Sequence, residues 1–260
     1  MALCVAVLTA GHAVARADSS AEPPDASCLA WLDAHAIHYS QSKPLKGVRT
    51  PIEVQGPLDG IRLVSRDHRP PLMDCELARA LAEAAPVFAD LGITDLVYSA
   101  AYDYRTRRDS ARLSAHSNGL AIDVHSFVGP AQTLEVERDF ETGVGNWQGM
   151  STLTVSLEQC IGAPLTDVGR RLRTLACRLK LHPAFRVIVT RDDNEDHRDH
   201  FHLESWPDLE SRAHRHAYAR VTTPPVVSPS PIVSATSPKR ARKHSHHKKA
   251  IAKSRRAHSR

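Results

Sequence analysis

The stretch Ser114-Ala-His-Ser-Asn-Gly-Leu-Ala-Ile-Asp123 joins a polar loop, a turn signal and the start of an apolar run. Asn118 and Gly119 both tolerate the backbone reversal of a turn. Along a helix, His116 and Asp123 would be about 10 Å apart, an awkward span for two side chains that hold one ion. We therefore expect a loop that carries His116, a turn, and a strand that carries Asp123, with both side chains directed toward one point.

A second stretch, His197-Arg-Asp-His-Phe-His202, carries three imidazoles. On a strand, His200 and His202 point to the same side with their Cα atoms about 6–7 Å apart. Phe201 and Leu203 then face the core. Two imidazoles on one face, with a third three residues earlier in the sequence, indicate that these side chains bind one common ligand.

The rest of the chain indicates an α+β fold, an antiparallel sheet flanked by helices in a single domain. Helices are expected after the capping residues Asp74 and Thr166, the first being interrupted by Pro86 and the second ending at Pro183. A polar connector separates the last two expected strands. The strand-like runs are 96–99, 121–125, 185–190 and 200–204.

Composition and charge exclude several classes of protein. Of the 260 residues, 42% are hydrophobic and 24% charged, as in ordinary globular proteins. No apolar run approaches the roughly 20 residues of a membrane-spanning helix, so no transmembrane segment is expected. Ten of the 34 Lys and Arg residues, and none of the 29 Asp and Glu residues, lie in residues 221–260, which leaves residues 1–220 with a net charge of −5. The excess of basic residues belongs to the tail, and we expect no specific binding of nucleic acid.

Both ends of the chain differ from its middle. Residues 1–17 contain an apolar run followed by the small-x-small site Ala15-Arg-Ala17, typical of a secretory signal peptide, although no Lys or Arg precedes the run. An ordinary apolar N-terminus is the alternative. We expect a loose segment at 18–27, the domain at 28–210, and a Pro/Ser linker with a disordered basic tail at 221–260. The protein would be exported to the periplasm, cell envelope or extracellular space, where the tail either docks on anionic envelope polymers or only adds solubility.

Four cysteines lie outside residues 1–17, namely Cys28, Cys75, Cys160 and Cys177. An even number in an exported chain favours two disulfides, for which three pairings are possible. The sequence does not decide among them, but we favour Cys28–Cys75 and Cys160–Cys177 because each joins neighbouring segments. Four buried thiols are the alternative, and a cysteine metal site is disfavoured because no C-x-x-C pair exists.

Two His and one Asp form a suitable ligand set for Zn²⁺. Imidazole nitrogen and carboxylate oxygen both bind this ion at about 2.0–2.2 Å, and three protein ligands leave a fourth position open. An additional His nearby can then act as a general base or acid. The chain has 16 His residues, so that some lie close together by chance, and the two motifs together support a zinc site better than either alone.

The two motifs also resemble those of known families. The pattern S-x-H-x-x-G-x-A-x-D at 114–123 is similar to the zinc-binding signature of D-Ala-D-Ala carboxypeptidases and murein endopeptidases. The H-x-x-H-x-H spacing at 197–202 resembles that of the penicillin-insensitive murein endopeptidases. Residues 28–205 further resemble the extensin-like C-terminal domain family, which closes with an A-H-x-D-H-x-H-type strand. Here Asp196 replaces the Ala of that strand.

The resemblance assigns roles by position. It implies that His200 and His197 line the site and handle protons, and that Arg105 stabilises an oxyanion. Arg107 and Arg108 compete for the last role, and a surface or structural Arg is the alternative. The residues that the resemblance assigns to one Zn²⁺ are His116, Asp123 and His202.

One element of the carboxypeptidase pattern is missing. Those enzymes use a Glu shortly before the last His, whereas positions 198 and 199 here are Arg and Asp. We therefore expect a His to act as the base. Glu204 shares the strand face of His202 and could support it, and His125 shares the face of Asp123 and either supports that ligand or lies on the surface.

These assignments imply an exported zinc metallopeptidase that hydrolyses peptide bonds in peptidoglycan stem peptides, of the endopeptidase or D,D-carboxypeptidase type. The missing Glu suggests the alternative, a non-catalytic module that binds peptidoglycan or another cell-wall polymer and whose zinc site is structural or vestigial.

Overall fold

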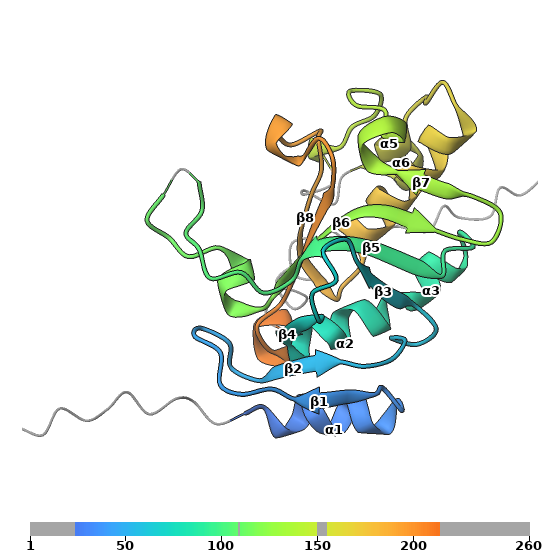
Figure 1. Cartoon of the computed structure of the whole chain (residues 1–260). Coiled ribbons are helices and arrows are strands. Elements are labelled where there is room, and N and C mark those ends of the chain that lie inside the picture. The colour runs from blue at the N-terminus through green and yellow to red at the C-terminus, as the bar shows by residue number, and fades with distance from the viewer. Residues whose placement is uncertain (1–23, 109, 150–154, 214–260) are drawn as a thin grey trace, which may run out of the picture. The chain divides into compact units, whose positions relative to one another are not determined.

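The computed structural model describes residues 24–108, 110–149 and 155–213 (Figure 1). The helices are α1 (Ala26–Ala34), α2 (Cys75–Glu83), α3 (Ala85–Ala89), η1 (Ala115–Asn118), α4 (Val136–Asp139), α5 (Leu157–Ile161), α6 (Asp167–Leu181) and η3 (Glu195–His197). The strands are β1 (Tyr39–Gln41), β2 (Pro51–Val54), β3 (Arg62–Ser65), β4 (Leu72–Asp74), β5 (Asp95–Ala100), β6 (Ala121–Val128), β7 (Thr133–Glu135), β8 (Phe185–Val189) and β9 (Phe201–Ser205). The fold class is α+β, as predicted.

The two predicted helices form with the predicted caps. The Asp74 carboxylate accepts a hydrogen bond of 3.0 Å from the Glu76 amide at the start of α2. The Thr166 hydroxyl accepts one of 2.9 Å from the Gly169 amide at the start of α6. A break at Ala84, ahead of the predicted interruption, divides the first helix into α2 and α3. Helix α1 begins at Ala26, inside the segment that was expected to be loose.

The strands form two sheets. A six-stranded sheet has the order β3-β5-β6-β9-β8, with β7 also paired to β6, and a three-stranded sheet has the order β1-β2-β4. The pairs β5–β6, β6–β9 and β8–β9 are antiparallel, as expected, but β3 and β5 run parallel. Strands β6 and β9 therefore lie side by side in the middle of the sheet, although about 80 residues separate them in the sequence.

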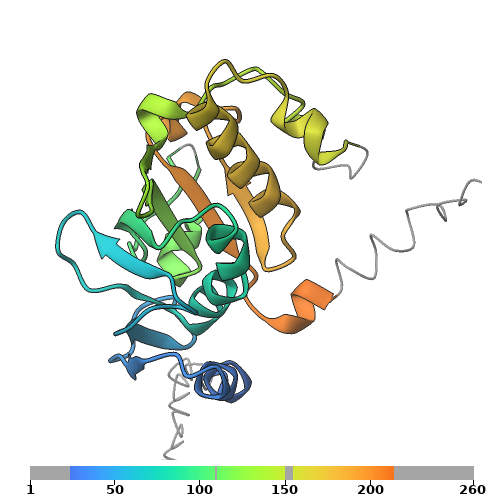
Figure 2. The same cartoon turned by 90° about the vertical axis from the view of Figure 1, so that its right-hand side faces the viewer.

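The core lies where helices pack against the large sheet. Helix α6 packs on β8 (Figure 2), and α2 contacts β9. The ring centroid of Phe201 on β9 lies 5.3 Å from that of Phe127 on β6 and 5.2 Å from that of Phe140. Phe201 and Leu203 are fully buried, as the alternation along the strand predicted. This packing fixes β6 and β9, the two strands that carry Asp123 and His202.

Both disulfides have the favoured pairing. Cys28–Cys75 joins α1 to the first residue of α2, and Cys160–Cys177 joins α5 to α6, each with a Cα–Cα distance of 6.1 Å. Two disulfides are consistent with a secreted or extracellular protein. In the described part of the chain, no helix combines the length and the apolar character that a membrane span requires. The signal peptide predicted at 1–17 and the linker and tail predicted at 221–260 lie outside the described residues, so that both stay predictions.

Candidate metal centre

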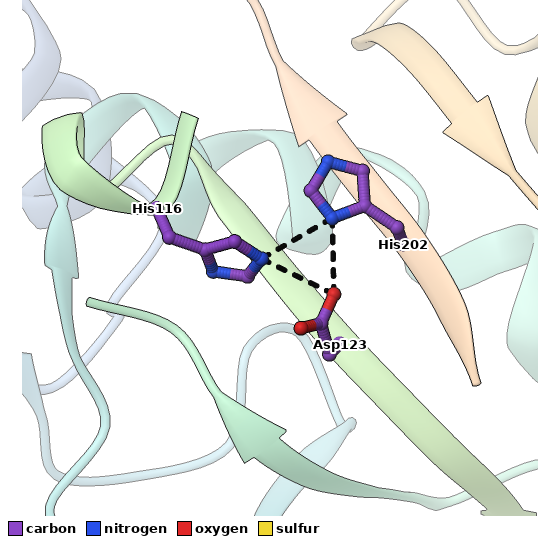
Figure 3. Close-up of side chains that lie close together, drawn as sticks. All are labelled: His116, Asp123 and His202. Atoms are coloured by element: carbon purple, nitrogen blue, oxygen red, sulfur yellow. Dashed lines mark hydrogen bonds and ion pairs between the residues drawn. The ribbon is translucent and has the colours of Figure 1, made fainter. Parts of the chain in front are cut away.

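The three predicted ligands meet at one point of the structure (Figure 3). Asp123 on β6 and His202 on β9 are directly opposed in the antiparallel ladder, and His116 extends toward them from η1. His202 Nδ1 lies 3.0 Å from Asp123 Oδ1. His116 Nε2 lies 3.2 Å from each of these two atoms. His116 is fully buried and the other two residues are nearly so, because the sheet and the η1 turn cover them.

The loop that carries His116 is held by specific backbone geometry. The Ser114 hydroxyl caps η1, and Gly119 ends it with a φ of +66°, which a residue with a side chain rarely adopts. A Cβ at Gly119 would lie 2.6 Å from the backbone nitrogen of Asp74. The same nitrogen donates a hydrogen bond of 3.0 Å to the Gly119 carbonyl. The predicted sequence of loop, turn and strand is thus present, and Gly119 locks it against the start of α2.

Acceptors on the outer side orient both imidazoles. His116 Nδ1 lies 2.9 Å from the Ala101 carbonyl oxygen, so this nitrogen carries the proton and donates it. His202 Nε2 lies 3.7 Å from Glu204 Oε2. The opposite nitrogens, Nε2 of His116 and Nδ1 of His202, therefore face the point beside Asp123 where an ion would lie.

This donor set fits a zinc ion. The three atoms form a triangle with sides of 3.0, 3.2 and 3.2 Å. In a tetrahedral site with bonds of about 2.0–2.1 Å, ligand atoms lie about 3.3 Å from one another. Two imidazole nitrogens and one carboxylate oxygen are also a ligand set that zinc commonly has in catalytic sites. All three predicted ligands therefore have suitable positions, and their binding of metal stays a prediction.

The electrostatics of the three groups suit a cation. Burial raises the pKa of Asp123, but hydrogen bonds from His116 and His202 outweigh it and hold this pKa well below its usual range. Burial lowers the pKa of His202, but Asp123 and Glu204 outweigh it and raise this pKa to about 9. The carboxylate is therefore ionised, and a metal ion that binds at this point has to displace a proton from His202.

His200, a predicted catalytic residue, lies beside the centre. Its Nε2 is 3.5 Å from Asp123 Oδ1, and its Nδ1 is 2.9 Å from Asp199 Oδ1. The contact with Asp199 fixes the ring, so that Nε2 faces the centre. Sequence reasoning missed this role of Asp199. The only available signal was its position directly before His200, and neighbours in sequence do not usually share a face.

Asp199 also contacts His125, and these two residues with His200 form a second group of possible metal ligands. Both nitrogens of His125 already have partners. Nδ1 lies 2.8 Å from the Asp199 carbonyl oxygen, and Nε2 lies 2.8 Å from Ser99 Oγ. This group therefore fits an ion less well. His125 is buried, so that it does not lie on the surface, and its Nδ1 contacts Asp199.

The other two predicted catalytic residues lie at the rim of the centre. The ring centroid of His197 is 5.0 Å from that of His200 and 5.8 Å from that of His202, and its Nδ1 lies 2.6 Å from Asn194 Oδ1. Burial and the neighbouring imidazoles lower the pKa of His197 to about 4. Arg105 lies with Nη2 4.0 Å from Asp123 Oδ2. All six predicted site residues are thus gathered in one place.

A cleft of about 610 Å³ opens over this centre. His116, Asp123 and His202 form part of its lining, together with His197 and His200. Four arginines also line it, and one of them, on β8, has no counterpart in the sequence analysis. The arginines are Arg105, Arg107, Arg108 and Arg186.

Comparison with known proteins gives one match. A family model described as Extensin-like protein C-terminus covers residues 26–215, which include the whole centre and both disulfides. Neither the curated proteins nor the solved structures contain a significant match. Because the match spans most of the chain and nearly all of its described residues, the chain belongs to the extensin-like protein C-terminus family.

Proposed function

We propose that this protein is an exported zinc metallopeptidase that hydrolyses peptide bonds in peptidoglycan stem peptides. The observation that carries the proposal is the convergence of His116 Nε2, Asp123 Oδ1 and His202 Nδ1 within 3.0–3.2 Å. The resemblance of both motifs to zinc-dependent murein peptidases supports the reaction and the substrate. The two disulfides agree with an oxidising compartment, where peptidoglycan lies.

The position of the three residues favours a catalytic over a structural metal site. Structural zinc sites are closed by four protein ligands, whereas catalytic sites keep one position open. Here three ligand residues line a cleft of about 610 Å³, which has room for several residues of peptide. When bound, zinc would supply a Lewis acid that activates water and polarises the peptide carbonyl.

The residues around the centre can perform the proton transfers of hydrolysis. As the oxygen of water bonds to the peptide carbonyl carbon, His200 Nε2 accepts a proton from the water. Arg105, close to Asp123, stabilises the negative charge that develops on the carbonyl oxygen. The bond from carbon to nitrogen then breaks, and His200 donates the proton that it accepted to the leaving amine. The products are a carboxylate and an amine.

Asp199 explains how a His can replace the Glu that carboxypeptidases of the related group use. Its carboxylate lies 2.9 Å from His200 Nδ1 and therefore holds the imidazole with Nε2 toward the centre. It also stabilises the imidazolium that forms when His200 accepts a proton. We assign His200 as the base and then the proton donor, His197 as a neutral imidazole that lines the site, and Asp199 as a positioning residue.

Metal analysis and product chromatography on the full-length protein test the proposal. We expect about one equivalent of zinc per chain, and cleavage of cross-linked muropeptides that is lost in His202→Ala. His182→Ala is the matched control, because His182 lies on the C-terminal side of α6 and does not line the cleft. Muropeptide profiles that are the same for zinc-loaded wild type and His202→Ala would contradict it. Binding to insoluble sacculi without released fragments would favour the non-catalytic wall-binding alternative.

A further inference from the structure

The backbone pairing of β6 with β9 ends one position before His200. The last pair that joins these strands is Val124 with Phe201. The next residue of β6, His125, is also the one that the pairing of β5 with β6 leaves out. A residue in such a bulge directs its side chain differently from its neighbours in the ladder. The side chain of His125 therefore reaches the chain just ahead of β9, where the backbone ladder no longer holds it.

The His125 imidazole binds Asp199 at this point. Its Nδ1 lies 2.8 Å from the Asp199 carbonyl oxygen and 3.6 Å from Asp199 Oδ2. Because a carbonyl oxygen only accepts hydrogen bonds, Nδ1 carries a proton and donates it. The other nitrogen, Nε2, lies 2.8 Å from Ser99 Oγ on β5. The His125 side chain is only 10% exposed, so that these two contacts give the ring one fixed orientation.

The carboxylate of Asp199 thus lies between two imidazoles. Its Oδ1 lies 2.9 Å from His200 Nδ1, and its Oδ2 faces His125 Nδ1. The Asp199 side chain is 37% exposed, and a carboxylate held on one side only would rotate toward solvent. The contacts with His125 hold both the backbone and the side chain of this residue. They therefore fix the group that orients the proposed base.

From these contacts we infer that His125, held in turn by Ser99, is a positioning residue that keeps the Asp199 carboxylate directed at His200. The inference rests on the proposed function, because it concerns how the base of that reaction is held. His125 does not line the cleft and therefore acts through Asp199 rather than on the substrate. With Asp199 as acceptor, a neutral His200 carries its proton on Nδ1 and presents an unprotonated Nε2 to the centre, as a base requires.

Two substitutions separate the hydrogen bond from the space that the ring fills. His125→Phe keeps a ring without the donor, and His125→Asn places an amide N–H close to the position of Nδ1. With zinc-loaded full-length protein and cross-linked muropeptides, we expect kcat to fall about tenfold in the Phe variant at unchanged KM, and the Asn variant to retain most of it. His182→Phe, outside the cleft, is the matched control. His125→Gln, whose amide lies on the Nε2 side, takes the place of the Phe variant if that variant does not fold.

A double-substitution cycle distinguishes positioning from a general structural role. If His125 acts through Asp199, His125→Phe should cost little in kcat once Asp199→Asn has already removed the carboxylate. Losses that multiply in the double variant would show that His125 only stabilises the fold. Full activity of His125→Phe, or equal losses in the Phe and Asn variants, would likewise overturn the inference.

The state of His200 can also be measured without catalysis. NMR spectra of full-length protein labelled at the imidazole nitrogens, recorded in alkaline buffer, report which nitrogen carries the proton, and the signals that His200→Gln lacks belong to His200. We expect Nδ1–H in wild type and in His125→Asn, and a mixture with Nε2–H in His125→Phe. The same tautomer in all three proteins would overturn the inference. If the expected change occurs but wild type cleaves no muropeptide, the proposed function alone is refuted. If wild type cleaves and the tautomer does not change, the inference alone is refuted.

Discussion

Replacing Glu204 by Gln tests whether the centre is built to bind metal. Glu204 is buried, and its Oε2 lies 3.7 Å from His202 Nε2, the nitrogen that does not face the centre. Gln has the same shape but no charge, so that it holds the imidazole less firmly and makes it a weaker ligand. The three ligand residues stay in place, and the variant should still take up one zinc ion per chain.

The structure sets the size of the effect. Partners of metal-binding histidines typically contribute 10–100-fold in metal affinity, or about 1.4–2.7 kcal/mol. The distance of 3.7 Å is longer than a full hydrogen bond, and Arg186 shares the carboxylate at 3.2 Å. Both facts place Glu204 at the lower end of the range. We expect zinc to bind about tenfold more weakly.

Competition with a chromogenic chelator measures the zinc dissociation constants of both proteins. Glu195→Gln is the matched control, because Glu195 is exposed, pairs with Arg191 and does not line the cleft. If Glu204→Gln binds zinc as tightly as the control, His202 is not oriented for metal by its neighbour. The assignment of Glu204 as the residue that supports His202 in metal binding would then be wrong.

Three further predictions address the centre, the disulfides and the tail. Asp123→Ala removes the anionic ligand and should abolish zinc retention after dialysis, so that metal analysis showing one equivalent would contradict the assigned ligand set. Cys28→Ser combined with Cys75→Ser removes a link across 47 residues and should lower the free energy of unfolding by about 4 kcal/mol, as measured by urea denaturation. An unchanged midpoint would show that the link does not constrain the unfolded chain. Deletion of residues 221–260 removes ten cations and should weaken adhesion to envelope fragments at low salt without changing the hydrolysis rate. Equal sedimentation of both proteins with such fragments would refute a docking role of the tail.

Local signals were sufficient for the long elements of the fold and insufficient for the short ones. Helix α6 has a cap at Thr166 and a regular apolar face, and it could be predicted closely. Strand β1 has only three residues and β3 only four, which is too short for a periodic pattern to stand out. Their pairing depends on partners elsewhere in the chain. For the same reason, the parallel pairing of β3 with β5 was not predicted.

The candidate ligands could be predicted because motif spacing carries much of their geometry. His116 and Asp123 are joined by one turn, whose reversal Gly119 makes possible. The approach of His202 to Asp123 depends on the register of β6 and β9, which no local pattern encodes. The resemblance of both motifs to known families indicated that His202 binds the same ion as Asp123. Where the sequence was read without such a guide, as at Arg186, the residue was missed.

The pairing of β5 with β6 explains why the surroundings of the centre were harder to predict than the centre itself. In the ladder, Asp123 pairs with Ala100 and Val124 with Tyr98, which leaves Ser99 of β5 unpaired. The next pair is Ser126 with Val97, which leaves His125 of β6 unpaired. Such bulges turn a side chain away from the face that strict alternation gives it. They bring His125 Nε2 to 2.8 Å from Ser99 Oγ and its Nδ1 to the Asp199 carbonyl oxygen, whereas alternation allowed either a contact with Asp123 or a surface position. The direction of a side chain beside a bulge is a property of the strand pair, and a single sequence cannot specify it.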